Sequence, residues 1–322
     1  MQPICFFLSK LLCREAVYCI IAVGKECAMI YTLTLNPSLD YIMECPAFTL
    51  GETNRSSREA VRFGGKGINV AAVLSSLGKE VLAVTLLGGE TGVLLARLLK
   101  EKGIPFEALS VRESTRINVK ILSRGITELN ARGPAISIDE WEGTLRYFDK
   151  ITEKDTLLLS GSIPSSLPAD IYARFMERGR GRVILDTSGE ALRAALPCRP
   201  YLVKPNESEL REVLGIPDDA ELDAERGAKA LLKMGARNVL VSLGEKGALL
   251  ACEDGSVLRR AAPRGEAKNT VGAGDAMLAG FLYGEEKGRA AALRYAVAAG
   301  SATAFGGTLA SREQIEALVA QI

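Results

Sequence analysis

The segment 269–281 contains the residues best suited to chemistry, because a glycine turn leads there into an apolar helical pattern. Gly272 and Gly274 permit a tight turn, and the apolar pattern from Ala276 onward predicts the start of a helix. Free N–H groups and the dipole at a helix start form an anion site without any arginine. Asp275 stands in the first turn, where its carboxylate can accept a proton from an attacking hydroxyl while these N–H groups hold a phosphoryl group. Taken alone, the segment is more typical of an ordinary helix start whose Asp complements the dipole.

Composition narrows the chemistry further. The 322 residues include no histidine, which removes the commonest general base, the commonest metal ligand and every Ser-His or Cys-His nucleophile. Proton transfer must therefore fall to Asp, Glu, Lys, Tyr or Cys. The net charge of +1, from 40 Lys and Arg against 39 Asp and Glu, gives no field that would recruit nucleic acid or an anionic membrane. An anionic ligand must be held by local groups.

The glycine clusters do not match the common nucleotide-binding fingerprints. The clusters at 65–67 and 272–274 lack the final Gly or Ala of a dinucleotide-binding loop, because Val70 and Met277 occupy that place. The sequence also contains no Gly-x-x-x-x-Gly-Lys-Ser/Thr. A Rossmann dehydrogenase and a P-loop ATPase are both disfavoured.

The elements that must position these residues alternate along the chain. Short Val/Ile/Leu-rich runs alternate with helical patterns, which predicts an α/β fold with a doubly wound, mainly parallel sheet flanked by helices. Helices are predicted over 69–77 and 92–102, each closed by a glycine, and capping boxes predict two more that start at Ser137 and Ser311. The predicted strands are 30–35, 81–86, 156–160, 183–186, 201–203 and 239–242.

Two regions depart from this succession of strands and helices. Polar and apolar residues alternate over 41–62 and 115–129, which predicts antiparallel strands in a small lid sheet. We therefore expect one domain over 29–322 with a lid excursion. Residues 1–28 are expected to be a non-native or disordered N-terminal extension, because the sequence from Met29 onward opens like the first strand of a domain. Their apolar runs are far shorter than the roughly 20 residues of a membrane span. The seven cysteines form no CxxC pair, so reduced thiols in a cytoplasmic protein are expected.

Two motifs in the right order indicate a family. Residues 64–69 read GGKGIN and residues 269–275 read NTVGAGD, and together they are a far stronger signal than either alone. Over essentially all of 29–322 the chain resembles the ribokinase-like carbohydrate kinases, and within them the phosphofructokinase B branch. The resemblance implies that fold and an ATP-dependent kinase activity. The segments TLTLNPSLD, LSGSIP, KPNESE and SLGEKG, at 32–40, 159–164, 204–209 and 242–247, agree with it.

The resemblance also implies roles around the acceptor sugar. Asp275 matches the catalytic base, and its neighbours Gly272, Ala273 and Gly274 match the anion hole. Asp40 matches the carboxylate that accepts hydrogen bonds from sugar hydroxyls, although an Asx turn is its structural alternative. Gly64, Gly65 and Asn69 match residues whose backbone and amide groups approach the sugar closely.

On the nucleotide side the resemblance implies a second set of residues. Lys204 and Asn206 match residues near the phosphates, and Asn206 with Glu209 matches an element that holds Mg²⁺ through water. An ordinary helix start is the alternative for that element. The remaining matches would lie against ATP: Ser242, Gly244 and Gly247 in a turn, and Val297 and Ser301 beside the adenine. A Val297 that faces the core is an equally open interpretation.

The segment 115–121 bears on the substrate. It resembles the 1-phosphofructokinases more closely than relatives that act on unphosphorylated sugars, which implies phosphorylation of fructose 1-phosphate to fructose 1,6-bisphosphate. Arg116 is the expected anchor for the existing phosphate, because a guanidinium fork donates two parallel hydrogen bonds. A solvated lid charge is its structural alternative. Further candidates for the phosphate are Arg55, Lys66 and Lys120.

Several alternatives stay open at this point. Tagatose 6-phosphate kinase and 6-phosphofructokinase activities belong to the same class, and a kinase of an unphosphorylated sugar or nucleoside lies further away. A catalytically silent sugar- or nucleotide-binding regulator is the alternative from another class, and the intact Asp275 with its glycine turn argues against it. Lid sheets of the family often pair between subunits, so a homodimer through the lid is also expected.

Overall fold

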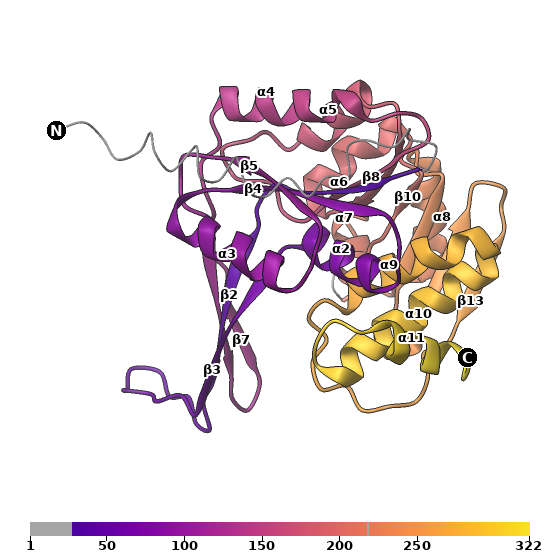
Figure 1. Cartoon of the computed structure of the whole chain (residues 1–322). Coiled ribbons are helices and arrows are strands. Elements are labelled where there is room, and N and C mark those ends of the chain that lie inside the picture. The colour runs from indigo at the N-terminus through magenta and orange to yellow at the C-terminus, as the bar shows by residue number, and fades with distance from the viewer. Residues whose placement is uncertain (1–27, 218) are drawn as a thin grey trace.

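The computed structural model describes residues 28–217 and 219–322, and the N-terminal extension expected before Met29 lies almost wholly outside them. Its main sheet has nine strands in the order β13-β12-β11-β10-β9-β8-β1-β4-β5 (Figure 1). Neighbours from β5 through to β11 are parallel, and β12 and β13 add antiparallel edges. The strands are β1 (Ile30–Thr34), β4 (Val81–Leu87), β5 (Phe106–Ser110), β8 (Thr156–Ser160), β9 (Arg182–Asp186), β10 (Leu202–Val203), β11 (Asn238–Ser242), β12 (Ala248–Cys252) and β13 (Val257–Arg260).

Helices cover both faces of this sheet. Successive strand residues point to opposite faces and both sets are buried, so each face packs against its own apolar core. In β8, Leu158 belongs to one core, whereas Leu157 and Leu159 belong to the other. The first core is covered by α2 (Lys66–Ser76), α3 (Gly89–Glu101), α9 (Ala273–Gly284), α10 (Arg289–Gly306) and α11 (Arg312–Val319). The second is covered by α4 (Ile138–Tyr147), α5 (Ile171–Arg178), α6 (Gly189–Ala195), α7 (Glu207–Leu214) and α8 (Ala224–Lys233). Single 3₁₀ turns are η1 (Phe148–Lys150), η2 (Leu196–Cys198), η3 (Gly244–Lys246) and η4 (Glu285–Lys287).

The predicted doubly wound sheet is confirmed, and so are the two helix starts that capping boxes predict. The helices predicted over 69–77, over 92–102 and from Ala276 each begin three residues earlier, as α2, α3 and α9. The six predicted strands correspond to β1, β4, β8, β9, β10 and β11. Ser137 and Ser311 both cap their helices with complete capping boxes, since each hydroxyl accepts from the N–H of the third helical residue. Strands β5, β12 and β13 were not predicted.

The strand order reverses next to β1. From β1 the chain adds β4 and β5 on one side, and then returns to place β8 on the other side. The loops that follow β1 and β8 therefore diverge at the carboxyl ends of the sheet, which is where ligands bind in open α/β sheets. None of the helices in the described residues is long and apolar enough to cross a membrane.

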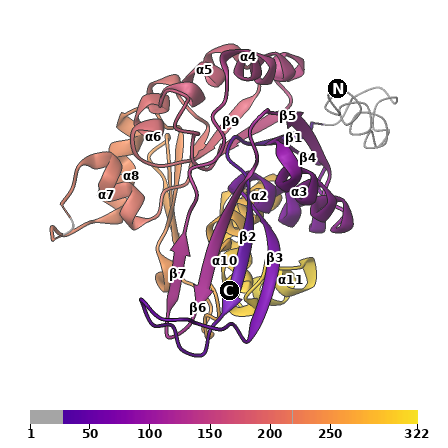
Figure 2. The same cartoon turned by 90° about the vertical axis from the view of Figure 1, so that its left-hand side faces the viewer.

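A second, four-stranded sheet stands away from the main domain as the predicted lid (Figure 2). Its order is β3-β2-β6-β7, with antiparallel hairpins at both edges and a parallel pair, β2 with β6, in the middle. The parallel pair was not predicted. It arises because β2 follows β1 and β6 follows β5, so both strands leave the same end of the main sheet. The lid strands are β2 (Ser38–Glu44), β3 (Arg58–Gly64), β6 (Arg116–Leu122) and β7 (Ile126–Leu129).

Candidate active site

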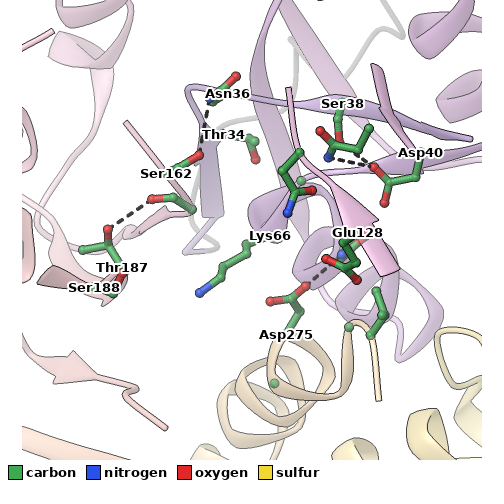
Figure 3. Close-up of a pocket in the computed structure, with 18 of the residues that line it drawn as sticks. Thr34, Asn36, Ser38, Asp40, Lys66, Glu128, Ser162, Thr187, Ser188 and Asp275 are labelled. Carbon is green, nitrogen blue, oxygen red and sulfur yellow. Dashed lines mark hydrogen bonds between the residues drawn. The ribbon is translucent and has the colours of Figure 1, made fainter. Parts of the chain in front are cut away.

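A cavity of about 790 Å³ lies between the carboxyl ends of the central strands and the lid. Its size suits a small substrate together with part of a nucleotide. Both the lid and the two helices α2 and α9 contribute to its wall (Figure 3). The predicted site residues that line it are Asp40, Gly65, Lys66, Asn69, Arg116, Lys120, Lys204, Asn206, Glu209, Ser242, Gly272, Gly274 and Asp275.

Other predicted residues lie outside the cavity lining. Arg55 is exposed in the loop between β2 and β3, and Gly244 is exposed in η3. Gly247 is buried at φ 92°, where a side chain would collide with the backbone of Arg260. Val297 is buried in the first core, as its structural alternative supposed, and Ser301 is half-buried on the same helix.

Two helix N termini converge on Asp275. Gly65 precedes α2 at φ 129°, and Gly272 precedes α9 at φ 79°, so glycine is favoured at both positions. Asn69 Nδ2 in α2 donates a hydrogen bond of 2.8 Å to Asp275 Oδ2 in α9. This bond joins the two sequence motifs, which are far apart along the chain.

Burial controls the charge of Asp275. The residue is only 7% exposed, and this desolvation, together with the nearby charge of Asp186, raises its pKa to about 6. The hydrogen bond from Asn69 and the charges of Lys66 and Lys204 oppose the rise. The carboxylate is consequently ionised at neutral pH and more basic than an exposed Asp.

A buried ion cluster lies beside it. Lys66 Nζ contacts Asp186 Oδ1 at 3.1 Å and Glu209 Oε1 at 3.5 Å, while Lys204 Nζ contacts the same Asp186 Oδ1 at 3.3 Å. Burial raises the pKa of Asp186, but the two lysines more than offset this and hold it below its usual value. Burial lowers the pKa of Lys66, yet its carboxylate neighbours raise it above the usual value, so Lys66 stays protonated.

The lid presents a polar face to the cavity. Asp40 Oδ1 accepts hydrogen bonds from Ser38 Oγ at 2.7 Å and from Asn118 Nδ2 at 3.1 Å. Asp40 Oδ2 pairs with Lys120 Nζ at 3.1 Å, and Lys120 also lies 3.6 Å from Glu128. Gly64 is needed behind this group, because a Cβ there would lie 2.6 Å from Asp40 Oδ1.

Arg116 differs from the other cations of the cavity. Its Nη1 and Nη2 donate to the carbonyls of Ala131 and Asn36, both at 2.9 Å, and its buried Nε donates to no group in the described chain. Among the described residues no carboxylate lies within 4.0 Å of the guanidinium. Burial lowers the pKa of Arg116, and the charge of Asp40 partly offsets this effect. Its charge is therefore only weakly compensated within the protein.

The predicted metal-binding element forms the start of α7. Asn206 Oδ1 accepts from the N–H of Glu209, and Glu209 Oε2 accepts from the N–H of Asn206 in return. Glu209 Oε1 faces Lys66 at 3.5 Å. In the part of the chain that the structure describes, no three His, Cys, Asp or Glu side chains are grouped to hold a metal ion.

Most of the chain matches a known family model. The model, described as pfkB family carbohydrate kinase, matches residues 33–311. The chain belongs to the pfkB family. Family membership makes it an ATP-dependent phosphotransferase with ATP as a substrate, and the predicted resemblance is confirmed.

Similar proteins of known activity narrow the activity within the pfkB family. The chain is 41% identical to the 1-phosphofructokinase of Bacillus subtilis and 35% identical to that of Borreliella burgdorferi. Each match covers 91% of this chain, with 98% and 97% of the respective relatives. A crystal structure of phosphofructokinase-2 from Escherichia coli in complex with fructose-6-phosphate superposes with a TM-score of 0.84, at 29% identity over 91% of this chain and 99% of that one. The pfkB protein described here is accordingly a fructose-phosphate kinase.

Three residues of the site were missed from the sequence, and two of them, Asn118 and Glu128, line the cavity. Asp186 ends β9, Asn118 lies in β6 and Glu128 lies in β7, and all three contact a predicted site residue. A polar residue at the carboxyl end of a predicted parallel strand was a usable signal for Asp186. For Asn118 and Glu128 the signal was weak, because alternating lid strands expose polar residues on either face.

We predict that Asp275→Asn stabilises the protein at pH 8 by up to about 3 kcal/mol, because the folded state no longer buries a charged carboxylate. Between about pH 4 and pH 6 the folded wild type retains a proton that the unfolded chain has lost. Wild-type stability should therefore fall as the pH rises through this window, and the advantage of the variant should vanish below about pH 4. Urea unfolding at both ends of the range measures the difference. Equal stability at pH 8 would contradict the raised pKa.

Proposed function

We propose that this pfkB protein transfers the γ-phosphoryl group of ATP to the 6-hydroxyl of fructose 1-phosphate, giving fructose 1,6-bisphosphate and ADP. The observation that carries the proposal is Arg116, a cavity-lining cation without a carboxylate partner in the described chain. A substrate phosphate would supply the missing anion, whereas an uncharged sugar would not. The choice of fructose 1-phosphate is supported by the 41% and 35% identity to 1-phosphofructokinases.

Asp275 is the proposed catalytic base. As the sugar oxygen attacks the γ-phosphorus, its proton passes to the Asp275 carboxylate, a bond forms between that oxygen and phosphorus, and the bond from phosphorus to the bridging oxygen of ADP breaks. N–H groups of the turn Gly272, Ala273 and Gly274 form the proposed anion hole for the phosphoryl oxygens. The pKa of about 6 supports this role, since the base is ionised at neutral pH.

The lid is proposed to orient the sugar. Asp40 lines the cavity with its carboxylate fixed by Ser38, Asn118 and Lys120, so it can accept hydrogen bonds from sugar hydroxyls at a defined place. Gly65 and Asn69 complete this side at the start of α2. A sugar held in this way keeps its reacting hydroxyl near Asp275 and correctly oriented throughout the reaction.

The nucleotide phosphates are proposed to lie near Lys204, Asn206 and Ser242, all of which line the cavity. Mg²⁺ is proposed to accompany ATP there, where it would neutralise phosphate charge. The available donors suit an ion that keeps its water ligands, because Glu209 offers one carboxylate and Asn206 is occupied in the helix cap. Gly244, Gly247 and Ser301 are proposed to contact the outer parts of ATP, whereas Val297 packs in the first core.

A coupled ADP-release assay with a panel of acceptors tests the substrate. The panel comprises fructose 1-phosphate, fructose 6-phosphate, tagatose 6-phosphate and free fructose. The highest kcat/KM is expected for fructose 1-phosphate. Preference for either 6-phosphate would assign 6-phosphofructokinase or tagatose 6-phosphate kinase activity instead.

We predict that Asp275→Asn lowers kcat at least about 10²-fold, because the amide cannot accept the hydroxyl proton. Affinity for ATP should change little, since the variant retains the proposed phosphate contacts, namely the N–H groups of the glycine turn and the side chains of Lys204 and Asn206. Steady-state kinetics together with ATP titration by calorimetry measure both effects. Retention of more than half the wild-type kcat would eliminate Asp275 as the base.

We predict that Arg116→Ala lowers kcat/KM for fructose 1-phosphate roughly ten- to a hundredfold, since each charge-assisted hydrogen bond contributes about 1.5–3 kcal/mol. KM for ATP should stay nearly constant. Arg116→Lys should recover only part of the loss, because an ammonium lacks the two-pronged geometry. Arg58→Ala is the control, because this lid arginine is 73% exposed. Unchanged constants in Arg116→Ala, or equal use of free fructose, would refute the phosphosugar assignment.

We also propose a homodimer through the lid. Strand register places Val61, Ile117 and Leu129 on the face away from Asp40, and they are 41%, 46% and 59% exposed. We predict that Leu129→Asp converts a dimer into a monomer in sedimentation equilibrium. Ile126→Asp is the matched control, because Ile126 is exposed on the other face of the same strand. A wild-type monomer, or an intact Leu129→Asp dimer, would exclude this interface.

A further inference from the structure

Asp186 connects two lysines that belong to different parts of the site. It ends β9 with no exposed surface, and its Oδ1 contacts both Lys66 Nζ and Lys204 Nζ. Its Oδ2 accepts no hydrogen bond from the described chain. The two lysines therefore determine the orientation of the carboxylate, and the carboxylate determines where their ammonium groups lie.

The two ammonium groups flank the start of α9. Lys66 opens α2 and reaches into the cavity near Asp275 (Figure 3). Lys204 follows β10 and is only 4% exposed, and a Cβ at Gly274 would lie 3.2 Å from its Nζ. One lysine thus approaches the glycine turn from the helix that forms the sugar side, and the other approaches it from the nucleotide side.

We infer that Asp186 is a positioning residue that holds Lys66 and Lys204 as a two-lysine clamp on the phosphoryl group during transfer. This inference rests on the proposed function of the same site. An ammonium group has three N–H donors, so a shared carboxylate leaves donors on both lysines for phosphoryl oxygens. Without Asp186 the two like charges would repel each other and separate.

The clamp explains why a carboxylate is buried beside a reaction that generates negative charge. Donors that are held in place before the reaction stabilise the transition state without reorganisation, and removal of one such donor typically costs about 10²–10³ in kcat. Asp186 itself would repel the phosphoryl group, but each lysine lies between it and the cavity contents as a fixed counter-charge. A purely structural ion pair would instead affect stability and leave kcat of the folded enzyme unchanged.

Asp186→Asn tests the inference, because the amide keeps the size of the side chain and loses the charge. We predict that kcat falls roughly 10²-fold in folded enzyme, while KM for the phosphosugar changes less than about threefold. Asp155→Asn is the matched control: Asp155 is a buried carboxylate at the opposite end of the sheet that accepts from Met29 and Thr152. It should lower the melting temperature and leave kcat unchanged. A wild-type kcat in Asp186→Asn, or equal loss of kcat in both variants, would overturn the inference.

A double-mutant cycle with Lys66→Met provides the second measurement. If Asp186 acts through the lysines, the combined variant should lose at least tenfold less kcat than the product of the two single losses. Losses that multiply would show that Asp186 acts independently, and would overturn the clamp. If Asp186→Asn does not fold, Lys66→Met and Lys204→Met test the clamp instead. Each must lower kcat by a larger factor than it changes KM for ATP or for the phosphosugar. A change confined to the KM for ATP would assign Lys204 to nucleotide binding alone and reject the clamp.

The acceptor used in these measurements is whichever panel sugar phosphate the wild type phosphorylates best. A preference for an acceptor other than fructose 1-phosphate would refute the proposed substrate and leave the clamp testable. Normal activity with fructose 1-phosphate in Asp186→Asn would refute the clamp and leave the substrate assignment intact. The two failures are therefore distinguishable.

Discussion

Pairing of buried charge is the constraint on which this active site depends. Four cations and four carboxylates line one cavity, and a charge removed from water is tolerated only when an opposite charge or several hydrogen bonds compensate it. Lys66 and Lys204 share Asp186, and Lys120 is paired with Asp40. Within the described chain Arg116 donates to neutral carbonyls, and Asp40 compensates its charge only in part. The cavity thereby contains one weakly compensated cation, Arg116 at the start of β6, and two paired lysines near the start of α9.

The sheet brings these charges together through its strand order. The reversal beside β1 opens a crevice, and residues after β1, β8, β9 and β10 reach it from loops that are far apart in the sequence. Close backbone approach then depends on particular glycines. A Cβ at Gly65 would lie 2.9 Å from Thr34, and one at Gly64 would strike Ser38 and Asp40. Helix α2 can begin near the reacting centre only because neither position carries a side chain.

The sequence predicted what depends on neighbouring residues and missed what depends on distant ones. The glycine turn with Asp275 and the GGKGIN segment were recognisable because their residues are adjacent in the chain. Asp186 was missed because its partner Lys66 is 120 residues away. Strand β5 was missed because its FEALS sequence is short and largely exposed, without an apolar run or regular alternation. The parallel lid pair depends on where two main strands end, which no local pattern records.

On the proposed function, the cations of the cavity do not by themselves distinguish fructose 1-phosphate from fructose 6-phosphate. Phosphorylation of fructose 1-phosphate at carbon 6 and of fructose 6-phosphate at carbon 1 give the same bisphosphate, so the cations that line the cavity suit either reaction. The order of phosphorylation must then be determined by hydrogen-bonding contacts with the sugar ring. Asp40 and Asn118 are joined by a hydrogen bond of 3.1 Å on the lid side of the cavity, where they can distinguish the two orientations of the ring. On the proposed function, selection between the two substrates falls to the lid, and selection for a phosphorylated sugar falls to Arg116.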